Sequence, residues 1–149
     1  MQDLKELYQE VILDHNRHPR NFGCMDGATC EAKGYNPLCG DRLKVYLKLI
    51  DNTILDLSFE GNGCAISQAS ASIMTEVIKG LNVTDARALF HQVHELLTND
   101  AFDAKTISSP KLQVLAGVKA YPARVKCASL AWHTLVAALN QDSTDAKTE

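Results

Sequence analysis

The chain has 149 residues, of which 46% are hydrophobic and 22% are charged, and its formal net charge is -3. This size and balance favour one globular domain with a normal core and exclude a fibrous or extensively disordered protein. The slight acidity leaves no basic surface for nucleic acid, and no apolar stretch reaches the roughly 20 residues of a membrane-spanning helix. The beginning of the chain lacks a secretory-signal pattern, so we expect a cytoplasmic protein without nucleic-acid or membrane partners.

The first half of the chain predicts one helix followed by three strands. Apolar residues recur at helical spacing over residues 3–14, and this helix should end just before Pro19, because proline disfavours helical geometry in the preceding residue. A short strand is expected over residues 28–35. Apolar and polar residues then alternate on both sides of an Asp51-Asn52 turn, which predicts a hairpin that completes a three-stranded antiparallel sheet.

The second half predicts helices that cover this sheet. The first is expected over residues 65–79, and the second runs from a cap at Thr84 or Asp85 to about Leu97. After a polar loop over residues 98–108, a short helix should begin at Pro110 and the last helix at Pro122. The fold class is therefore α+β, with a small three-stranded antiparallel sheet and helices packed against it. We expect one domain over residues 1–140 and a polar, disordered tail over residues 141–149.

Five cysteines occur at wide and irregular spacings, at Cys24, Cys30, Cys39, Cys64 and Cys127. An odd number in a domain of this size favours free thiols or metal thiolates over a disulfide framework. Taken singly, a free cysteine is more often a small buried hydrophobic residue than a reactive group.

Cys39 lies in the segment NPLCGD, in a turn that is expected just before a strand. Pro37 fixes one backbone angle of this turn, and Gly40 permits a tight or left-handed conformation. Asp41 follows Cys39 by two residues, and a thiolate with a carboxylate at this spacing suits zinc or ferrous iron.

Cys64 follows a Gly-Asn-Gly segment and begins a predicted helix, where unpaired N–H groups and the helix dipole favour the thiolate. Cys127 lies early in the last helix beside Arg124 and Lys126, two cations that should also favour ionisation. Three thiols and one carboxylate match a tetrahedral zinc site, although they form no compact Cys-x-x-Cys pair. The candidate ligands are Cys39, Asp41, Cys64 and Cys127.

Four segments, DHNRHPRNFG, NPLCGD, EGNGCAISQASAS and YPARVKCASLAWHTL, resemble the U-type iron-sulfur cluster assembly proteins, the IscU and NifU amino-terminal family, and most closely its SufU branch. The resemblance extends from about Leu4 to Leu139. It implies an α+β fold with a three-stranded antiparallel sheet. It also implies that the family's metal ligands fall on Cys39, Asp41, Cys64 and Cys127.

Lys126 stands directly before the last cysteine, where scaffold members of the IscU kind have histidine, and their Leu-Pro-Pro-Val-Lys chaperone-binding motif is missing from this chain. The stretch between the Cys64 helix and the last helix, which includes residues 88–108, is longer than in those scaffold members, and this too is similar to SufU. These features imply a zinc-dependent sulfurtransferase that accepts persulfide sulfur from a cysteine desulfurase. We expect Cys39 to be the sulfur acceptor, because its loop is mobile while Cys64 and Cys127 are tied to helices. A partner residue would replace Cys39 on a site kept labile by Asp41, and free Cys39 would attack the desulfurase persulfide.

Two other functions fit the same four residues. A scaffold would bind iron and assemble a 2Fe-2S cluster in place of zinc, and would deliver it to apo iron-sulfur acceptors or other assembly proteins. A non-catalytic zinc module would only bind partners, and loss of one thiolate should then unfold it. A cysteine hydrolase is disfavoured, because no cysteine and histidine form a supporting motif.

The remaining histidines and cysteines are predicted to lie outside the site: His15, His18, His91, His94, His133, Cys24 and Cys30. The two histidine pairs have helical spacing but no thiol or carboxylate at ligand spacing, and the first pair should help end the first helix. His133 should point away from Cys127, because six residues turn a helix by roughly 240°. Cys24 and Cys30 are expected to be spare thiols.

Overall fold

The computed structural model describes residues 4–140 and 146–147, and its sheet has the strand order β3-β2-β1-β4. The strands are β1 (Cys30–Asn36), β2 (Asp41–Ile50), β3 (Thr53–Asn62) and β4 (Ala146–Lys147). The first three are antiparallel neighbours, which confirms the predicted sheet, and β4 adds to β1 in parallel. The prediction for the rest of residues 141–149 lies outside the described residues.

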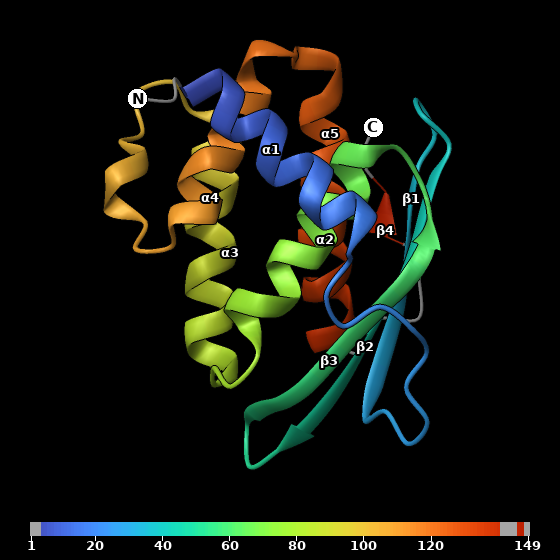
Figure 1. Ribbon diagram of the computed structural model, residues 1–149. Coiled ribbons are helices and arrows are strands. Elements are labelled where there is room, and N and C mark those ends of the chain that lie inside the picture. The colour runs from blue at the N-terminus through green and yellow to red at the C-terminus, as the bar shows by residue number, and fades with distance from the viewer. Residues whose placement is uncertain (1–3, 141–145, 148–149) are drawn as a thin grey trace.

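The helices lie together on one face of this sheet (Figure 1). They are α1 (Leu4–Arg17), α2 (Ala65–Ile78), α3 (Val83–Thr98), α4 (Pro110–Leu115) and α5 (Pro122–Leu139), with short 3-10 helices η1 (Ala104–Thr106) and η2 (Ala116–Ala120). The predicted α+β class, with helices packed against a small sheet, is confirmed. Within the described ranges, none of these helices combines the length and the apolar character needed to cross a membrane.

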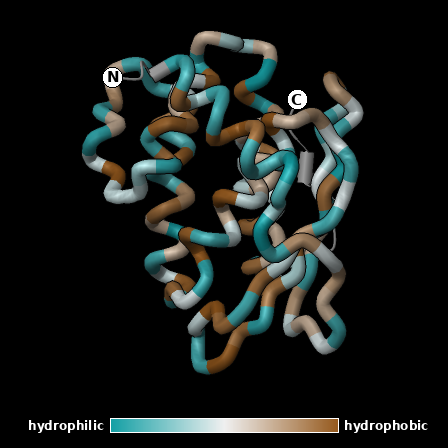
Figure 2. Tube along the Cα trace, viewed as in Figure 1, coloured by the Kyte–Doolittle hydropathy of each residue, from teal (hydrophilic) through white to brown (hydrophobic). Residues whose placement is uncertain are grey.

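Local signals account for most element boundaries. Pro110 and Pro122 begin α4 and α5, and α1 ends at Arg17 shortly before Pro19, all as predicted. The tight turn between β2 and β3 has positive φ angles at both central residues, as a two-residue hairpin turn requires. Figure 2 shows hydrophobic residues at the outer end of this hairpin, and Ile50 is half exposed there.

Helix α3 begins earlier than predicted. Its cap is Asn82, whose side-chain oxygen accepts the backbone N–H of Asp85 at 2.7 Å. The prediction of a cap at Thr84 or Asp85 is therefore wrong, because an asparagine upstream already supplies the acceptor. The expected polar loop over residues 98–108 contains η1, and Ile107 within it is buried in the core.

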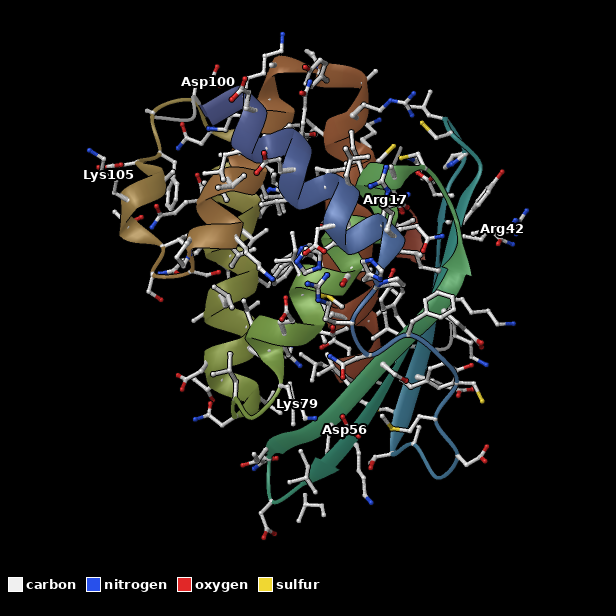
Figure 3. The ribbon with its side chains drawn as sticks, viewed as in Figure 1. Arg17, Arg42, Asp56, Lys79, Asp100 and Lys105 are labelled. Carbon is white, nitrogen blue, oxygen red and sulfur yellow. The ribbon has the colours of Figure 1, made fainter. Side chains whose placement is uncertain are left out.

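The open face of the sheet is polar where it borders the β1–β2 turn. Arg42 points away from the helices (Figure 3), and its guanidinium carbon lies 4.3 Å from the centre of the Tyr35 ring. These two residues face each other across β1 and β2. At the opposite end, Lys79 and Asp56 form an ion pair of 3.5 Å between the end of α2 and β3 (Figure 3).

Close packing holds α5 against both the sheet and α2. A Cβ atom at Gly34 would lie only 2.0 Å from Thr134 Oγ1, so the missing side chain allows α5 to approach β1. Trp132 Nε1 donates to Ser70 Oγ at 3.2 Å, and this hydroxyl donates to the Ala128 carbonyl. Together these contacts fix the middle of α5 against β1 and α2.

Helix α1 is fixed to α2 by a buried histidine. His15 lies in the last turn of α1, and its Nδ1 is 2.7 Å from Ser72 Oγ. Its Nε2 is 3.4 Å from the Glu76 carboxylate. Burial lowers the pKa of His15 to about 4, and the cations of Lys111 and Arg20 act in the same direction. The neutral ring therefore connects the two helices.

Candidate metal centre

Two thiols and one carboxylate converge where the β1–β2 turn meets α5. One ligand atom from each of Cys39, Asp41 and Cys127 lies within 4.8 Å of the other two. The sulfur atoms of Cys39 and Cys127 are 3.3 Å apart. Cys39 is exposed, whereas Asp41 and Cys127 are fully buried. The group therefore combines one accessible sulfur with two protected donors.

The turn between β1 and β2 presents Cys39 because its backbone closes tightly. Asn36 and Asp41 are cross-strand partners at its base, and the Gly40 N–H donates to the Asn36 carbonyl at 2.8 Å. Gly40 has a φ of 72°, a conformation that glycine adopts without strain. The predicted left-handed glycine after Cys39 is confirmed.

Cys64 lies beside this group, although its sulfur is not among the atoms that meet the 4.8 Å limit. Its backbone N–H donates to Asp41 Oδ1 at 2.8 Å, while its sulfur caps α2 by accepting the Ser67 N–H at 3.5 Å. A Cβ at Gly63 would lie 2.8 Å from Asp41 Oδ1, so glycine permits this close approach. The structure thus brings three of the four predicted ligands together and holds the fourth next to Asp41 through its backbone.

Two buried polar side chains beside these residues have no counterpart in the prediction from sequence. The Asn36 amide donates to Asp41 Oδ2 at 3.1 Å and to Cys127 Sγ at 3.4 Å. The Ser67 hydroxyl is buried without a hydrogen-bond partner among the described residues. Both residues lie within segments that carry the family resemblance, but an asparagine before proline and a serine in a helix have no local pattern that separates them from ordinary turn and packing residues.

Burial has the largest effect on the charge of Cys127. It raises the pKa of this thiol, and contacts with Cys39 and Asp41 raise it further. The predicted effect of Arg124 is present, because its guanidinium interacts with this sulfur, but burial outweighs it. Arg124 also faces Cys39, with Nη1 at 3.4 Å from the Cys39 sulfur. A divalent cation reverses the effect of burial, because it stabilises the deprotonated sulfur directly.

The other cysteines and histidines lie elsewhere. Cys24 is exposed and Cys30 is buried at the start of β1, and neither belongs to the thiol–carboxylate group. His133 is partly buried on α5, with its ring centre 5.4 Å from that of Phe90 and 6.0 Å from that of His94. Within the part of the chain that the structure describes, no histidine joins a group of three or more potential ligands.

This fold and this group of side chains define a small α+β domain with a thiol–carboxylate centre. The NifU-like N terminal domain family matches residues 7–128, and the chain belongs to this family. The resemblance predicted from four sequence motifs is confirmed, and the chain is a member of the iron-sulfur cluster assembly proteins.

Two curated relatives match nearly the full chain. The zinc-dependent sulfurtransferase SufU of Bacillus subtilis (strain 168) is 38% identical, and the match covers 89% of each protein. The iron-sulfur cluster assembly scaffold protein IscU of Thermotoga maritima is 41% identical, and the match covers 93% of this chain and 96% of that protein.

Solved structures support the same fold. One is FiSufU of Fervidobacterium islandicum AW-1, described as a candidate iron-sulfur cluster assembly scaffold of the SUF system. It has a TM-score of 0.82 and 34% sequence identity, and the match covers 90% of this chain and 97% of that one. A NifU-like N-terminal protein from Brucella abortus has a TM-score of 0.78 over 93% of this chain and 96% of that one. Its identity of 23% supports the fold alone.

Proposed function

We propose that this protein accepts persulfide sulfur from a cysteine desulfurase at a zinc site formed by Cys39, Asp41, Cys64 and Cys127. The observation that carries this proposal is the convergence of Cys39, Asp41 and Cys127 within 4.8 Å. Three sulfurs and one carboxylate oxygen form a donor set that suits tetrahedral zinc. The name of the Bacillus subtilis relative, a zinc-dependent sulfurtransferase, supports the same activity here.

The surroundings of the donors suit a divalent cation. Asp41 and Cys127 are both fully buried, and buried anionic groups need a compensating positive charge. The Ser67 hydroxyl is unpartnered among the described residues, and it lies close enough to Asp41 that a Cβ at Gly63 would touch both. It is available to donate to a carboxylate or to the sulfur of Cys64. Zinc, when bound, supplies the charge that keeps the thiols deprotonated at neutral pH.

Cys39 is the sulfur acceptor in this proposal. It is exposed on the β1–β2 turn, whereas Cys64 caps α2 and Cys127 is buried in α5. The Cys39 thiolate attacks the outer sulfur of the desulfurase persulfide. A sulfur–sulfur bond forms to Cys39, the bond to the desulfurase cysteine breaks, and that cysteine leaves as a thiolate. No oxidant or reductant is consumed, and the nearby Arg124 guanidinium stabilises negative charge on the attacking sulfur.

The direct partner is a cysteine desulfurase, and the sulfur then passes to other cluster assembly proteins or to apo iron-sulfur acceptors. We place this activity in the cytoplasm. The exposed side chain of Leu38, next to Cys39, lies at the position where the desulfurase has to approach.

Zinc content and desulfurase turnover test the proposal together. The purified protein should contain stoichiometric zinc and should raise the turnover of a cysteine desulfurase. Cys39→Ser should remove this increase, whereas Cys24→Ser changes an exposed thiol outside the group and should retain it. An increase that survives in Cys39→Ser excludes Cys39 as the acceptor.

A scaffold function is the second candidate, and the 41% identity to the Thermotoga maritima IscU scaffold favours it. Such a protein would assemble a 2Fe-2S cluster on the same four residues. Anaerobic purification separates the two functions. Brown protein with iron and sulfide in equal amounts supports the scaffold, whereas colourless protein with tightly held zinc supports sulfur transfer.

A further inference from the structure

Asn36 connects two of the proposed ligands from inside the protein. Its side chain is fully buried at the end of β1. One side-chain nitrogen donates to Asp41 Oδ2 at 3.1 Å and to Cys127 Sγ at 3.4 Å. An asparagine amide has two N–H donors, so each proposed ligand can receive one of them. Asn36 thus joins a residue of β2 to a residue of α5.

The remaining polar atom of Asn36 shapes the turn. Oδ1 accepts the Leu38 N–H at 3.2 Å, the side-chain contact two residues ahead that is typical of asparagine turns. The side chain therefore has two separable roles, one in the turn and one toward the ligands. Cys39, by contrast, is exposed and contacts Arg124 and Cys127.

We propose that Asn36 is a positioning residue that holds Asp41 and Cys127 in place for the metal while Cys39 is engaged elsewhere. The inference rests on the proposed function, because it assumes the zinc site. Hydrogen bonds from outside the coordination sphere orient metal ligands, and their loss typically weakens metal binding by roughly 10- to 100-fold. Without the Asn36 amide, the site should depend on Cys39 for retention of the metal.

Three substitutions separate the roles of Asn36. Asn36→Ser keeps a short acceptor that can form the turn contact but cannot reach either ligand. Asn36→Ala removes both roles. Asn36→Gln keeps the amide donor, so this variant should bind zinc more tightly than the serine and alanine variants do. The matched control is Asn82→Ala, which removes the cap of α3 at a place remote from the ligands.

The first experiment measures the Zn²⁺ dissociation constant by chelator competition, with circular dichroism to establish that each variant is folded. Asn36→Ser and Asn36→Ala should both raise the constant by roughly 10- to 100-fold. Asn82→Ala should leave it unchanged even though the fold is less stable. Co²⁺ bound in place of zinc should show altered thiolate absorption bands in Asn36→Ser, a change in ligand geometry that loss of stability alone does not produce.

The second experiment repeats the titration in a Cys39→Ser background. Zinc should remain bound when Asn36 is present, and the effect of Asn36→Ser should be larger than in the parent protein. Wild-type affinity in Asn36→Ser, or weakening in Asn36→Ala alone, overturns the inference. If the inference about Asn36 is overturned but the parent protein binds zinc and raises desulfurase turnover, the proposed function stands. If the parent protein binds no zinc, the proposed function and the inference both fail.

Discussion

The sulfur atoms of Cys39 and Cys127 lie 3.3 Å apart, although the two residues are 88 positions apart in the sequence. The fold brings them together by placing the β1–β2 turn over the second turn of α5. One thiol is exposed and the other is buried. This contact pairs a sulfur that can meet another protein with one that cannot, which is the arrangement that sulfur acceptance at Cys39 requires.

Mild oxidation of the chelator-treated protein should therefore produce a disulfide between Cys39 and Cys127. The sulfurs have to move only from 3.3 Å to about 2.05 Å, and the exposed turn can supply this movement. Non-reducing digestion with mass spectrometry identifies the linked peptides. Added zinc should slow the reaction, because it holds both thiolates. Cys30→Ser should leave the crosslink intact, whereas a predominant link through Cys24 or Cys64 contradicts the prediction.

Chelation should lower the stability of the protein without unfolding it. The core is built from large, fully buried side chains such as Trp132 and Phe59, which do not depend on the ligand residues. A ligand present at 100 to 1,000 times its dissociation constant stabilises a protein by about 3–4 kcal/mol, so the melting temperature should fall by roughly 5–15 °C. Circular dichroism before and after chelation measures both quantities. Complete loss of helical signal would instead support the non-catalytic zinc module.

Much of this architecture is encoded locally. The alternation on both sides of Asp51-Asn52 predicts the hairpin, and Pro110 and Pro122 mark helix starts, because each signal acts through neighbouring backbone atoms. The convergence of Cys39 with Cys127 is different. Their spacing carries no distance information, so the local context of each residue identified them only as candidate ligands, and the family resemblance strengthened that expectation.

The details that sequence could not predict depend on packing across elements. The sequence places Arg124 three residues before Cys127, and its guanidinium interacts with that sulfur but also reaches the β1–β2 turn, where it faces Cys39. The role of Asn36 depends on the registers of β1 and β2 and on the approach of α5. A one-dimensional pattern contains neither the register nor the side-chain conformations that create these contacts.

Gly34→Ala should displace α5 from the sheet. The added Cβ would lie 2.0 Å from Thr134 Oγ1 and 3.0 Å from Leu130 Cδ1. Overpacking of this kind costs about 1–3 kcal/mol. Guanidinium unfolding should show this loss, and the second substitution Thr134→Ala should recover part of it, since it removes the nearest obstacle. Simple additivity of the two substitutions would contradict the proposed collision.

The buried imidazole of His15 should make stability depend on pH in the acid range. Its pKa is lowered from 6.5 to about 4, chiefly by burial and then by Lys111 and Arg20, while Glu76 opposes the shift. Between these two values the unfolded chain binds more protons at His15 than the folded protein does. The contribution to stability is therefore complete above pH 6.5 and is lost as the pH falls toward 4. At about 1.4 kcal/mol for each pKa unit, the loss is at most about 3 kcal/mol.

Urea unfolding at pH 7 and pH 4.5 measures this loss in the parent protein and in His15→Gln. Glutamine carries no titrating group but can still donate or accept a hydrogen bond at Ser72. Between pH 7 and pH 4.5, the free energy of unfolding of His15→Gln should fall by roughly 2 kcal/mol less than that of the parent protein. His18→Gln removes an exposed histidine from the same end of α1 and should keep the parent's pH dependence. Equal losses in the parent and in His15→Gln would mean that other groups, such as the protein's carboxylates, account for the acid sensitivity.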